Sequence, residues 1–326
     1  MKAIVCSKYG PPEVLQLKEI DKPIPKDDEI LIKVCASSIN SADHRMMLAK
    51  PFLVRFMGEG MLKPKKSVPG IDMAGVVEAV GKSVKEFKTG DEVFGDVHES
   101  KLGAYAEYVC SKETENIVKK PAGVTFEQAA ATPVAGITAL QALRDHGQIK
   151  EGQRVLINGA SGGVGTFTVL IAKALGAEVT GVCSSKNLKL VKSIGADFVI
   201  DYTKENIKES QKRYDLIIDI AANLTAKDYI NLLNPKGIGI LVGYSSMFHM
   251  IGISLRSKKL EKKNGLKVKA MGGAKTSKKE LQYLGELIDT GKISPAIEKV
   301  YPLKETAKAM KHFHEEHAGA KIVISV

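Results

Sequence analysis

A short glycine-rich turn carries the clearest chemical signal in this sequence. It follows an apolar run at 155–158, which is typical of a buried strand, and precedes a helix-periodic stretch. In the spacing Ala160-x-Gly162-x-x-Gly165, alanine occupies the first glycine place of the dinucleotide fingerprint. Such a turn brings backbone N–H groups at a helix N-terminus close to a pyrophosphate. We therefore predict a dinucleotide site formed by Ala160, Ser161, Gly162, Gly163, Val164 and Gly165.

The strand after the helix of this turn indicates which dinucleotide binds. An NAD site usually places an acid about 20 residues past the glycines, where it accepts from the ribose 2′-hydroxyl. No acid lies between Glu178 and Asp197, and the strand ends instead in Ser184, Ser185 and Lys186. Because hydroxyls and an ammonium donate to a 2′-phosphate, we predict NADPH as the cofactor. The alternative is that Lys186 is only a solvated lysine at a helix start.

The elements around the turn must position it. A helix pattern, a strand at 179–183, a second helix pattern and a strand at 198–201 follow in order. This βαβαβ order predicts half of a doubly wound parallel sheet, and strands continue to alternate with helices to about residue 243. A glycine turn that merely joined one strand to one helix would not need the rest of this unit.

Length and composition limit the classes of protein. A chain of 326 residues with 44% apolar residues is long enough for two domains or one large α/β unit. It begins as a strand, and no stretch approaches the roughly 18 apolar residues of a membrane span, so we expect a cytoplasmic protein. The four cysteines stand far apart, which favours a reducing compartment over disulfides or a zinc knuckle.

A formal net charge of +11 raises the question of a nucleic-acid partner. Much of this charge is concentrated in lysines between Arg256 and Lys279. Aromatic residues, which stack on single-stranded bases, do not interleave with these lysines. We therefore expect a solvated basic face, or one that attracts an anionic cofactor. Contact with RNA or with an anionic membrane is the alternative.

The two ends of the chain have a different pattern from its middle. To about residue 122 the sequence alternates short β patterns with turns, as at 29–37 and 69–81, which predicts a small β-barrel. After residue 273 come a helix at 279–288, an extended piece at 297–301, a helix to about residue 317 and a strand at 321–326.

Three segments together carry a family resemblance: residues 69–91 with their Pro-Gly and Lys-Thr-Gly-Asp motifs, the segment 129–140, and the glycine turn. The chain resembles, nearly end to end, the medium-chain dehydrogenase/reductase superfamily. Within it, the chain is most similar to the zinc-free quinone oxidoreductase (zeta-crystallin-like) and alkenal/one oxidoreductase branch. The resemblance implies a GroES-like β-barrel domain from 1–122 and 274–326, with a Rossmann NADP-binding domain from 123–273 inserted into it. It also implies a homodimer that pairs through the strand ending at Met271.

The resemblance raises the question of zinc. The zinc-dependent branch takes its catalytic ligands from two cysteines and a histidine, and the matching positions here are Asn40, Ile71 and Val134. None of these side chains is a usual zinc ligand. Cys110 also stands alone where that branch has a cysteine-rich structural lobe. We predict no metal.

Three histidines near the end of the last helix offer a competing metal signal: His312, His314 and His317. On a helix, His314 and His317 share a face and His312 does not. The helix dipole favours histidines at a C-terminus, so we expect a surface cap, with a set of metal ligands as the alternative.

Without a Lewis acid, the chemistry must suit weak polarisation of the substrate oxygen. Hydride delivery to a conjugated C=C leaves a delocalised enolate, which hydrogen bonds stabilise. The resemblance places Asn40 beside the nicotinamide, with Asp43, His44 and Arg45 on the same loop as candidates to orient or polarise the substrate. Many relatives have a tyrosine where this chain has Arg45, and the alternative is that the loop is scaffold.

The resemblance implies further cofactor contacts: Thr132 and Thr138 near the nicotinamide end, Tyr202 near the adenosine phosphate, Ala221 near the ribose, and Gly243 with Tyr244 beside the ring. Together with the glycine turn and the end of the second strand, these positions complete the predicted NADPH site.

Two apolar segments indicate the kind of substrate. The methionine-rich stretch 46–62 lies where the family has one cleft wall, and methionines adapt to varied apolar shapes. The segment 247–251, which follows Gly243, is a second candidate wall. We predict a small hydrophobic electrophile, namely an enone, an alkenal or a quinone; ordinary core or a subunit interface is the alternative. The rival functions are a zinc-free alcohol or carbonyl dehydrogenase and a non-catalytic NADPH-binding protein with a basic interaction surface.

Overall fold

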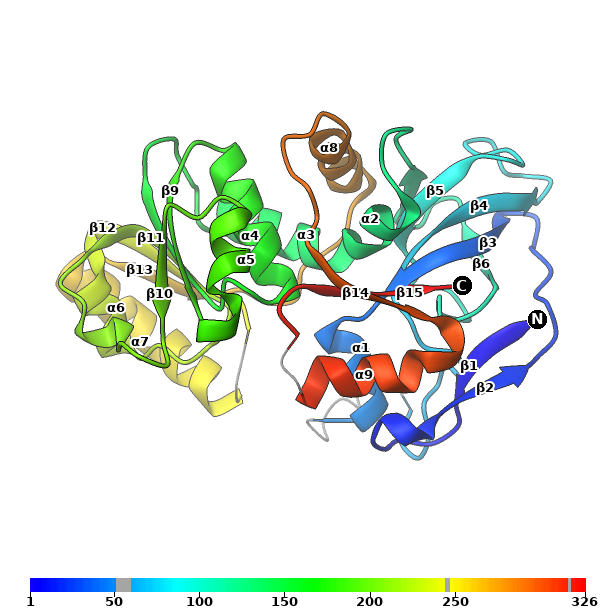
Figure 1. The fold of residues 1–326 in the computed structure, drawn as a ribbon, viewed down its shortest axis with the longest axis horizontal. Helices are drawn as coiled ribbons and strands as arrows, with labels where there is room; N and C mark the ends of the chain where they lie inside the picture. The colour runs from blue at the N-terminus through cyan, green and yellow to red at the C-terminus, as the bar shows by residue number, and fades with distance from the viewer. Residues whose placement is uncertain (51–59, 244–246, 316–317) are drawn as a thin grey trace. The chain divides into compact units, whose positions relative to one another are not determined.

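The computed structural model describes residues 1–50, 60–243, 247–315 and 318–326. These residues form two compact units (Figure 1). The first unit comprises Met1–Val134, Thr276–Gly291 and Ile297–Val326, and the second comprises Ala135–Lys275 and Lys292–Ala296. The domain bounds expected from the sequence, 1–122 with 274–326 and 123–273, remain a prediction.

A six-stranded parallel sheet forms the centre of the second unit. Its strands are β8 (Arg154–Asn158), β9 (Glu178–Cys183), β10 (Phe198–Asp201), β11 (Tyr214–Asp219), β12 (Leu233–Leu241) and β13 (Lys267–Ala270). They lie in the order β10-β9-β8-β11-β12-β13, and every neighbouring pair is parallel. Because the order reverses between β8 and β11, the carboxyl ends of these two strands form a switch point, where open α/β sheets bind ligands.

Helices cover both faces of this sheet (Figure 1). α4 (Gly163–Ala174) and α5 (Leu188–Ser193) lie on one face, and α6 (Ala226–Leu232) and α7 (Met247–Asn264) lie on the other. The chain enters the unit through α3 (Pro133–Gln141) and a π-helical turn, η3 (Ala142–His146). The apolar residues of the central strand β8 are fully buried, which explains its unbroken apolar run. This is the doubly wound arrangement that the sequence pattern predicts.

The lysine-rich segment forms much of α7 and β13, and the sequence pattern did not identify this helix. Ile253 and Leu260 are seven residues apart, or about two turns, and both are buried in the core of the unit. Lys258 and Lys262 are exposed. One narrow apolar stripe therefore holds the helix on the sheet in spite of its charge. No helix within the described residues is both long and apolar enough to cross a membrane.

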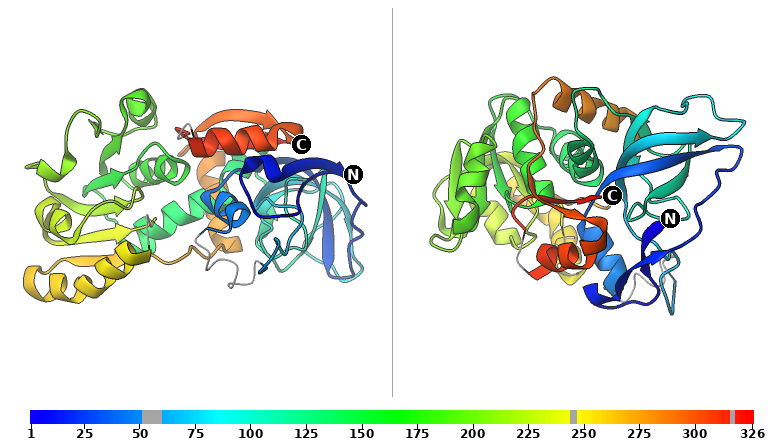
Figure 2. Two further views of the ribbon diagram at one scale, coloured as in Figure 1. Left: turned by 90° about the horizontal axis from the view of Figure 1, so that it is seen from below. Right: turned by 45° about the vertical axis from the view of Figure 1, so that its right-hand side comes forward.

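A seven-stranded, mostly antiparallel sheet forms the centre of the first unit, together with a separate antiparallel pair, β1 and β2. The strands are β1 (Lys2–Cys6), β2 (Leu15–Glu19), β3 (Glu29–Ser38), β4 (Asp72–Val80), β5 (Glu92–Asp96), β6 (Tyr108–Lys112), β7 (Ile117–Lys119), β14 (Ile297–Pro302) and β15 (Lys321–Ser325). The helices are α1 (Ser41–Leu48), α2 (Phe126–Ala131), α8 (Lys278–Asp289) and α9 (Thr306–Glu315). Both chain termini lie in this unit (Figure 2).

The long strand β3 determines where the end of the chain meets its beginning. One edge of β3 pairs with β4 along its length. The other edge is shared, because β6 pairs with Glu29 to Lys33 and β15 pairs with Ala36 to Ser38. The last strand of the protein therefore lies beside the point where β3 ends and the chain turns through Asn40 into α1.

Candidate active site

The loop between β3 and α1 is held by its own polar groups. Asn40 is the N-cap residue of α1, and its backbone N–H donates to Asp43 Oδ2 over 2.9 Å. Both side chains are buried. An acid three residues after an N-cap completes the local hydrogen bonding of a helix start, so this geometry follows directly from the sequence. It fixes Asn40 and Asp43, two predicted site residues, against each other.

Asp72, on β4, connects this loop to the rest of the unit. Its side chain is 0% exposed. Its Oδ2 accepts hydrogen bonds from Ser38 Oγ at 2.7 Å and from Asn40 Nδ2 at 2.9 Å, and its Oδ1 accepts from the backbone N–H of Val134 at 3.0 Å. Asn40 and Val134, which stand at two of the positions that match zinc ligands in the family, thus both donate hydrogen bonds to this carboxylate.

Lys321, the first residue of β15, supplies a buried cation to the same cluster. It is 2% exposed, and its Nζ donates to the Ile39 carbonyl at 3.1 Å, to Asn40 Oδ1 at 2.7 Å and to Asp72 Oδ2 at 3.5 Å. Burial lowers the pKa of Lys321, while the Asp72 and Asp43 carboxylates oppose that shift. The Asn40 amide is therefore held at both ends, with its oxygen on the ammonium and its nitrogen on the carboxylate.

Asp72 and Lys321 are site residues that the sequence pattern did not predict. Asp72 had a weak signal, because it follows Ile71 in the motif that matches a zinc-ligand segment. Lys321 had none, since a lysine at the start of a strand is most often solvated. Only the pairing of β15 with β3 brings it to Asn40, 281 residues away in the chain.

The Asp43 carboxyl has a pKa well above its usual range. Burial, followed by the nearby Asp72 charge, raises the pKa of Asp43 to about 7, against the opposing effects of the Asn40 hydrogen bonds and Lys321. Burial also raises the pKa of Tyr105 well above its ordinary value, and the adjacent Asp43 and Asp72 charges add to that shift. Asp43 therefore takes up or releases its proton near neutral pH.

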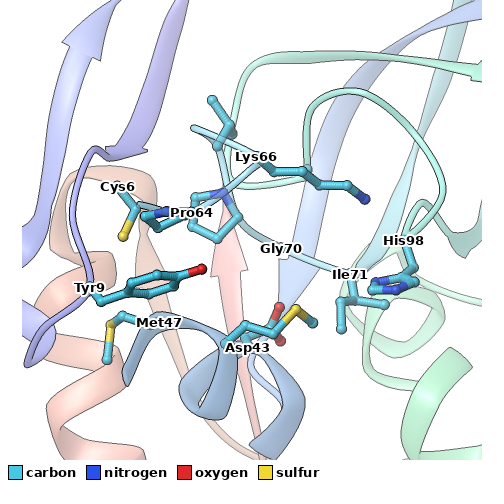
Figure 3. Close-up of a pocket in the computed structure, with 13 residues that line it drawn as sticks. Cys6, Tyr9, Asp43, Met47, Pro64, Lys66, Gly70, Ile71 and His98 are labelled. Carbon is cyan, nitrogen blue, oxygen red and sulfur yellow. The ribbon is translucent and has the colours of Figure 1, made fainter. Parts of the chain in front are cut away.

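A pocket in the first unit opens beside this loop (Figure 3). Much of its lining is apolar and includes Met46, Met47, Val68, Pro69 and Ile71. Asp43 lines it as well, and Figure 3 shows its carboxylate on a different side from Lys66 and His98. Met46 and Met47 belong to the predicted methionine-rich wall; residues 51–59 of that wall, and the side chains of 247–250 in the second predicted wall, lie outside what the structure describes.

His44 and Arg45 lie on the same helix as Asp43, but neither is among the described residues that line the pocket. His44 is 7% exposed, and its ring stacks on His314 of α9 with 4.2 Å between centroids. Burial, followed by the His314 charge, lowers the pKa of His44 to about 4. His44 is therefore neutral at physiological pH, and its catalytic role, like that of Arg45, stays a prediction.

The expected surface cap of histidines at the end of α9 is wrong for His312. This side chain is buried, its Nδ1 lies 3.0 Å from the Tyr301 hydroxyl, and its Nε2 lies 3.3 Å from Glu298. The buried side of α9 packs on the core of the first unit, and His312 lies on it one turn after Ala309. His317 lies outside the described residues.

In the second unit, the glycine turn is tightly packed at Gly165 and has open space at Gly162, where the helix begins. A Cβ at Gly165 would lie 2.1 Å from the Gly159 carbonyl oxygen, whereas a Cβ at Gly162 would meet nothing within 4 Å. Gly162 is the N-cap of α4 and places no side chain over the first N–H groups. Open space above free helix N–H groups suits a pyrophosphate. The turn therefore fits the predicted dinucleotide.

The switch point between β8 and β11 is organised by a pair of buried polar residues. Asn158 Nδ2 donates to Asp219 Oδ1 at 2.7 Å, and Asp219 accepts from the backbone N–H groups of Ala222 and Leu224. This places Ala221 next to the glycine turn, where its N–H donates to the Asn158 carbonyl. Gly243 follows the end of β12, and Tyr244 lies outside the described residues.

The remaining predicted cofactor residues differ in their exposure and in whether their side-chain donors are already hydrogen-bonded. Ser185 donates its hydroxyl proton to Asp201, so it has none left for a phosphate, and Asn187 Nδ2 bonds Ser161 Oγ at 3.1 Å. Lys186 and Tyr202 are exposed. In the first unit, Thr132 is buried and its hydroxyl donates to Gln128; in the second, Thr138 is half-buried.

Comparisons with known proteins agree with this architecture. Residues 26–122 match the alcohol dehydrogenase GroES-like domain, and residues 194–324 match the zinc-binding dehydrogenase domain. A quinone oxidoreductase of Sus scrofa is 33% identical, with 99% of this chain and 97% of that protein covered. The chain belongs to the quinone oxidoreductase branch of the medium-chain dehydrogenase/reductase superfamily. It is thus an oxidoreductase with a GroES-like domain and a Rossmann-type sheet.

Further members of the superfamily extend this match. An NADPH-dependent alkenal/one oxidoreductase of Arabidopsis thaliana is 32% identical, with 99% of this chain and 79% of that protein covered. The crystal structure of the Escherichia coli quinone oxidoreductase complexed with NADPH has a TM-score of 0.83 and 28% identity, with both chains fully covered. Membership implies that this chain, too, binds a nicotinamide cofactor.

One matching domain is described as zinc-binding, which makes the donor set at the zinc positions important. Asn40, Ile71 and Val134 offer an amide already hydrogen-bonded at both ends and two aliphatic side chains. Within the described residues, no group of three or more His, Cys, Asp or Glu side chains is arranged to hold a metal ion. These residues do not fit a catalytic zinc.

Proposed function

We propose that this protein uses NADPH to reduce the conjugated C=C of a hydrophobic enone, alkenal or quinone, without zinc. The observation that carries this proposal is that Asn40, at a position that matches a zinc ligand, is held by hydrogen bonds to Asp72 and Lys321 beside an apolar pocket. A saturated carbonyl needs strong polarisation because its reduction leaves a localised alkoxide. A conjugated acceptor leaves a charge spread over several atoms, for which hydrogen bonds and a nearby cation suffice.

The residues of the first unit have complementary tasks in this proposal. Asn40, held by Lys321 and Asp72, forms a fixed polar surface where the family resemblance places the reacting ring. Met46, Met47 and Ile71 bind the apolar part of the acceptor and exclude water from it. Bound NADPH would supply the hydride.

The preference for NADPH depends on the second unit. The open turn at Gly162 suits the pyrophosphate that NADH and NADPH share. Discrimination must come from the end of β9, where Ser185 is committed to Asp201, so Ser184 and Lys186 are the remaining candidates to contact a 2′-phosphate. Lys186 is exposed, as a residue that meets a soluble cofactor must be.

We also expect a homodimer. β13 is an edge strand of the six-stranded sheet, and an unpaired edge is a template for pairing with a second copy. Lys267 and Lys269 on that strand are exposed. Sedimentation velocity should give twice the monomer mass; a monomer at micromolar concentration would contradict this expectation.

The proposed function is tested by the consumption of NADPH with matched acceptors. We expect turnover with alkenals, enones and alkylated quinones, little turnover with saturated aldehydes of equal chain length, a lower rate with NADH, and no loss of activity after treatment with a chelator. Turnover confined to saturated aldehydes and alcohols would favour a carbonyl dehydrogenase. Binding of NADPH without turnover of any acceptor would favour a non-catalytic binding protein.

A further inference from the structure

Reduction of a conjugated C=C needs a proton as well as a hydride. Hydride addition at the β-carbon pushes the π electrons toward the α-carbon and the oxygen, and the resulting enolate must be protonated at the α-carbon to give the saturated product. A site that excludes water from an apolar acceptor also slows protonation by solvent. A positioned acid within the pocket would remove that limit.

The protein groups that line the pocket and carry an exchangeable proton are few. Within the described part of the chain they are Cys6, Tyr9, Asp43, Lys66 and His98. Tyr9 donates its hydroxyl proton to the Gly60 carbonyl at 2.6 Å, and Cys6 donates to the Lys8 carbonyl at 3.3 Å. Lys66 and His98 are half-buried rather than enclosed. Asp43, at 2% exposure, is the most buried of the five.

We propose that Asp43 is the acid that protonates the α-carbon of the reduced substrate, and that Asn40, itself held by Lys321 and Asp72, positions it. This inference rests on the proposed function. The backbone N–H of Asn40 occupies Asp43 Oδ2 and fixes the plane of the carboxyl group. Asp43 and Asn40 lie on one turn, so the acid stands next to the residue that the family resemblance places beside the nicotinamide.

The charges that face Asp43 keep its proton available at neutral pH. Asp72 from β4 repels a second negative charge, Lys321 from β15 attracts one, and Tyr105 contacts the carboxyl from the segment before β6. On the pocket side lie the titratable groups already named. Burial and the Asp72 charge together raise the pKa of Asp43 to about 7, which matches an acid to its working pH. Lys321 limits this rise, so that the proton can leave.

The step is balanced within the substrate and the acid. The O–H bond of Asp43 breaks, and a C–H bond forms at the α-carbon with the electron pair of the enolate. Asp43 becomes a carboxylate and regains a proton from water that enters the pocket after the product leaves. Each turnover thus consumes one hydride and one proton per C=C, and no other oxidant or reductant takes part.

The test compares Asp43→Asn with Asp228→Asn. Asparagine at position 43 keeps an oxygen to accept from the Asn40 N–H but has no acidic proton. Asp228 has the same capping position in α6, where it accepts from the Thr225 N–H at 2.7 Å, far from this cluster in sequence and in the other unit. Thermal melting and NADPH binding verify that each variant is folded.

With an alkenal, kcat/KM of the wild type and of Asp228→Asn should fall above about pH 7 as Asp43 loses its proton. Asp43→Asn should be lower by about 10²- to 10⁴-fold and show no such fall. In D₂O, the wild type should place deuterium on one face of the α-carbon, and Asp43→Asn on both faces.

Three outcomes would decide against the proposal in distinguishable ways. If Asp43→Asn keeps the wild-type rate, pH profile and stereospecificity, the proton donor is another group, and the proposed function stands. If Asp43→Asn does not fold, the D₂O experiment on the wild type still tests the proposal. Deuterium on both faces of the α-carbon would then contradict a fixed proton donor. If the wild type reduces no conjugated acceptor, the proposed function and this inference both fail.

Discussion

Replacing Lys321 by methionine tests whether the buried cluster is an integrated charge network. Methionine fills a similar volume but removes the ammonium group. The Asp72 carboxylate, which is 0% exposed, then loses its only cation among the described residues that contact it, and Asn40 loses the donor to its side-chain oxygen. Because the Asp72 carboxylate and the Asn40 amide are buried, water cannot take the place of the lost ammonium group.

The expected cost is large relative to total stability. Removing one member of a buried ion pair destabilises a protein by about 3–5 kcal/mol, out of a total of about 5–15 kcal/mol. Removing the second charge as well should recover part of this cost, so Lys321→Met with Asp72→Asn should be more stable than the sum of the two single effects by about 1–3 kcal/mol.

Urea unfolding followed by far-UV circular dichroism measures these differences. The matched control is Lys26→Met, because Lys26 is 76% exposed and pairs with Glu29 at 3.3 Å on the surface. Loss of such a pair should cost less than about 1 kcal/mol. If Lys321→Met is no less stable than Lys26→Met, or if the double variant shows additive losses, the cluster is not a coupled charge network and our account of Asn40 positioning is incorrect.

Three further predictions concern the cofactor turn, its specificity and the acid. Gly162→Ala should keep the wild-type melting temperature but bind NADPH more weakly in a fluorescence titration, whereas Gly165→Ala should melt earlier, since its Cβ would lie 2.1 Å from a carbonyl oxygen. Lys186→Ala should raise the KM for NADPH by about tenfold or more and leave the KM for NADH unchanged, because a hydrogen bond to a charged group contributes about 1.5–3 kcal/mol. An equal rise of both KM values would refute this role. The pKa of Asp43 is about 7 in the folded protein and about 4 in the unfolded chain, so between these values only the folded state holds the proton and stability falls as pH rises. The free energy of unfolding of the wild type, relative to Asp43→Asn, should therefore decrease by about 1.4 kcal/mol per pH unit up to about pH 7 and then level off, and a flat difference would contradict the raised pKa.

The sequence was most informative where local pattern and fold agree. The β8 strand, the glycine turn and α4 form a continuous unit in which the backbone geometry explains each residue type, so the doubly wound sheet was predictable. The dinucleotide site at this turn stays a prediction. Family resemblance added the first unit and the Asn40 loop. The local bond between Asn40 and Asp43 also follows from their spacing.

Long-range pairing determined what the sequence did not reveal. Lys321 is buried only because β15 lies against the end of β3, and nothing in its neighbours indicates this. The environment of His312 was wrongly predicted for a related reason: the helix dipole acts within α9 alone, whereas packing of α9 buries this residue. In α7, abundant lysines concealed the apolar pair Ile253 and Leu260. In each case tertiary contacts, rather than local propensity, decided the environment.

The identity of the bond that is reduced distinguishes conjugate reduction from carbonyl reduction. Incubation of the protein with NADPH and an alkenal of medium chain length, followed by gas chromatography and mass spectrometry, distinguishes the two possible products. We predict the saturated aldehyde, formed in equal amount to the NADPH consumed. The unsaturated alcohol as the main product would show hydride delivery to the carbonyl carbon, and would contradict conjugate reduction at this site.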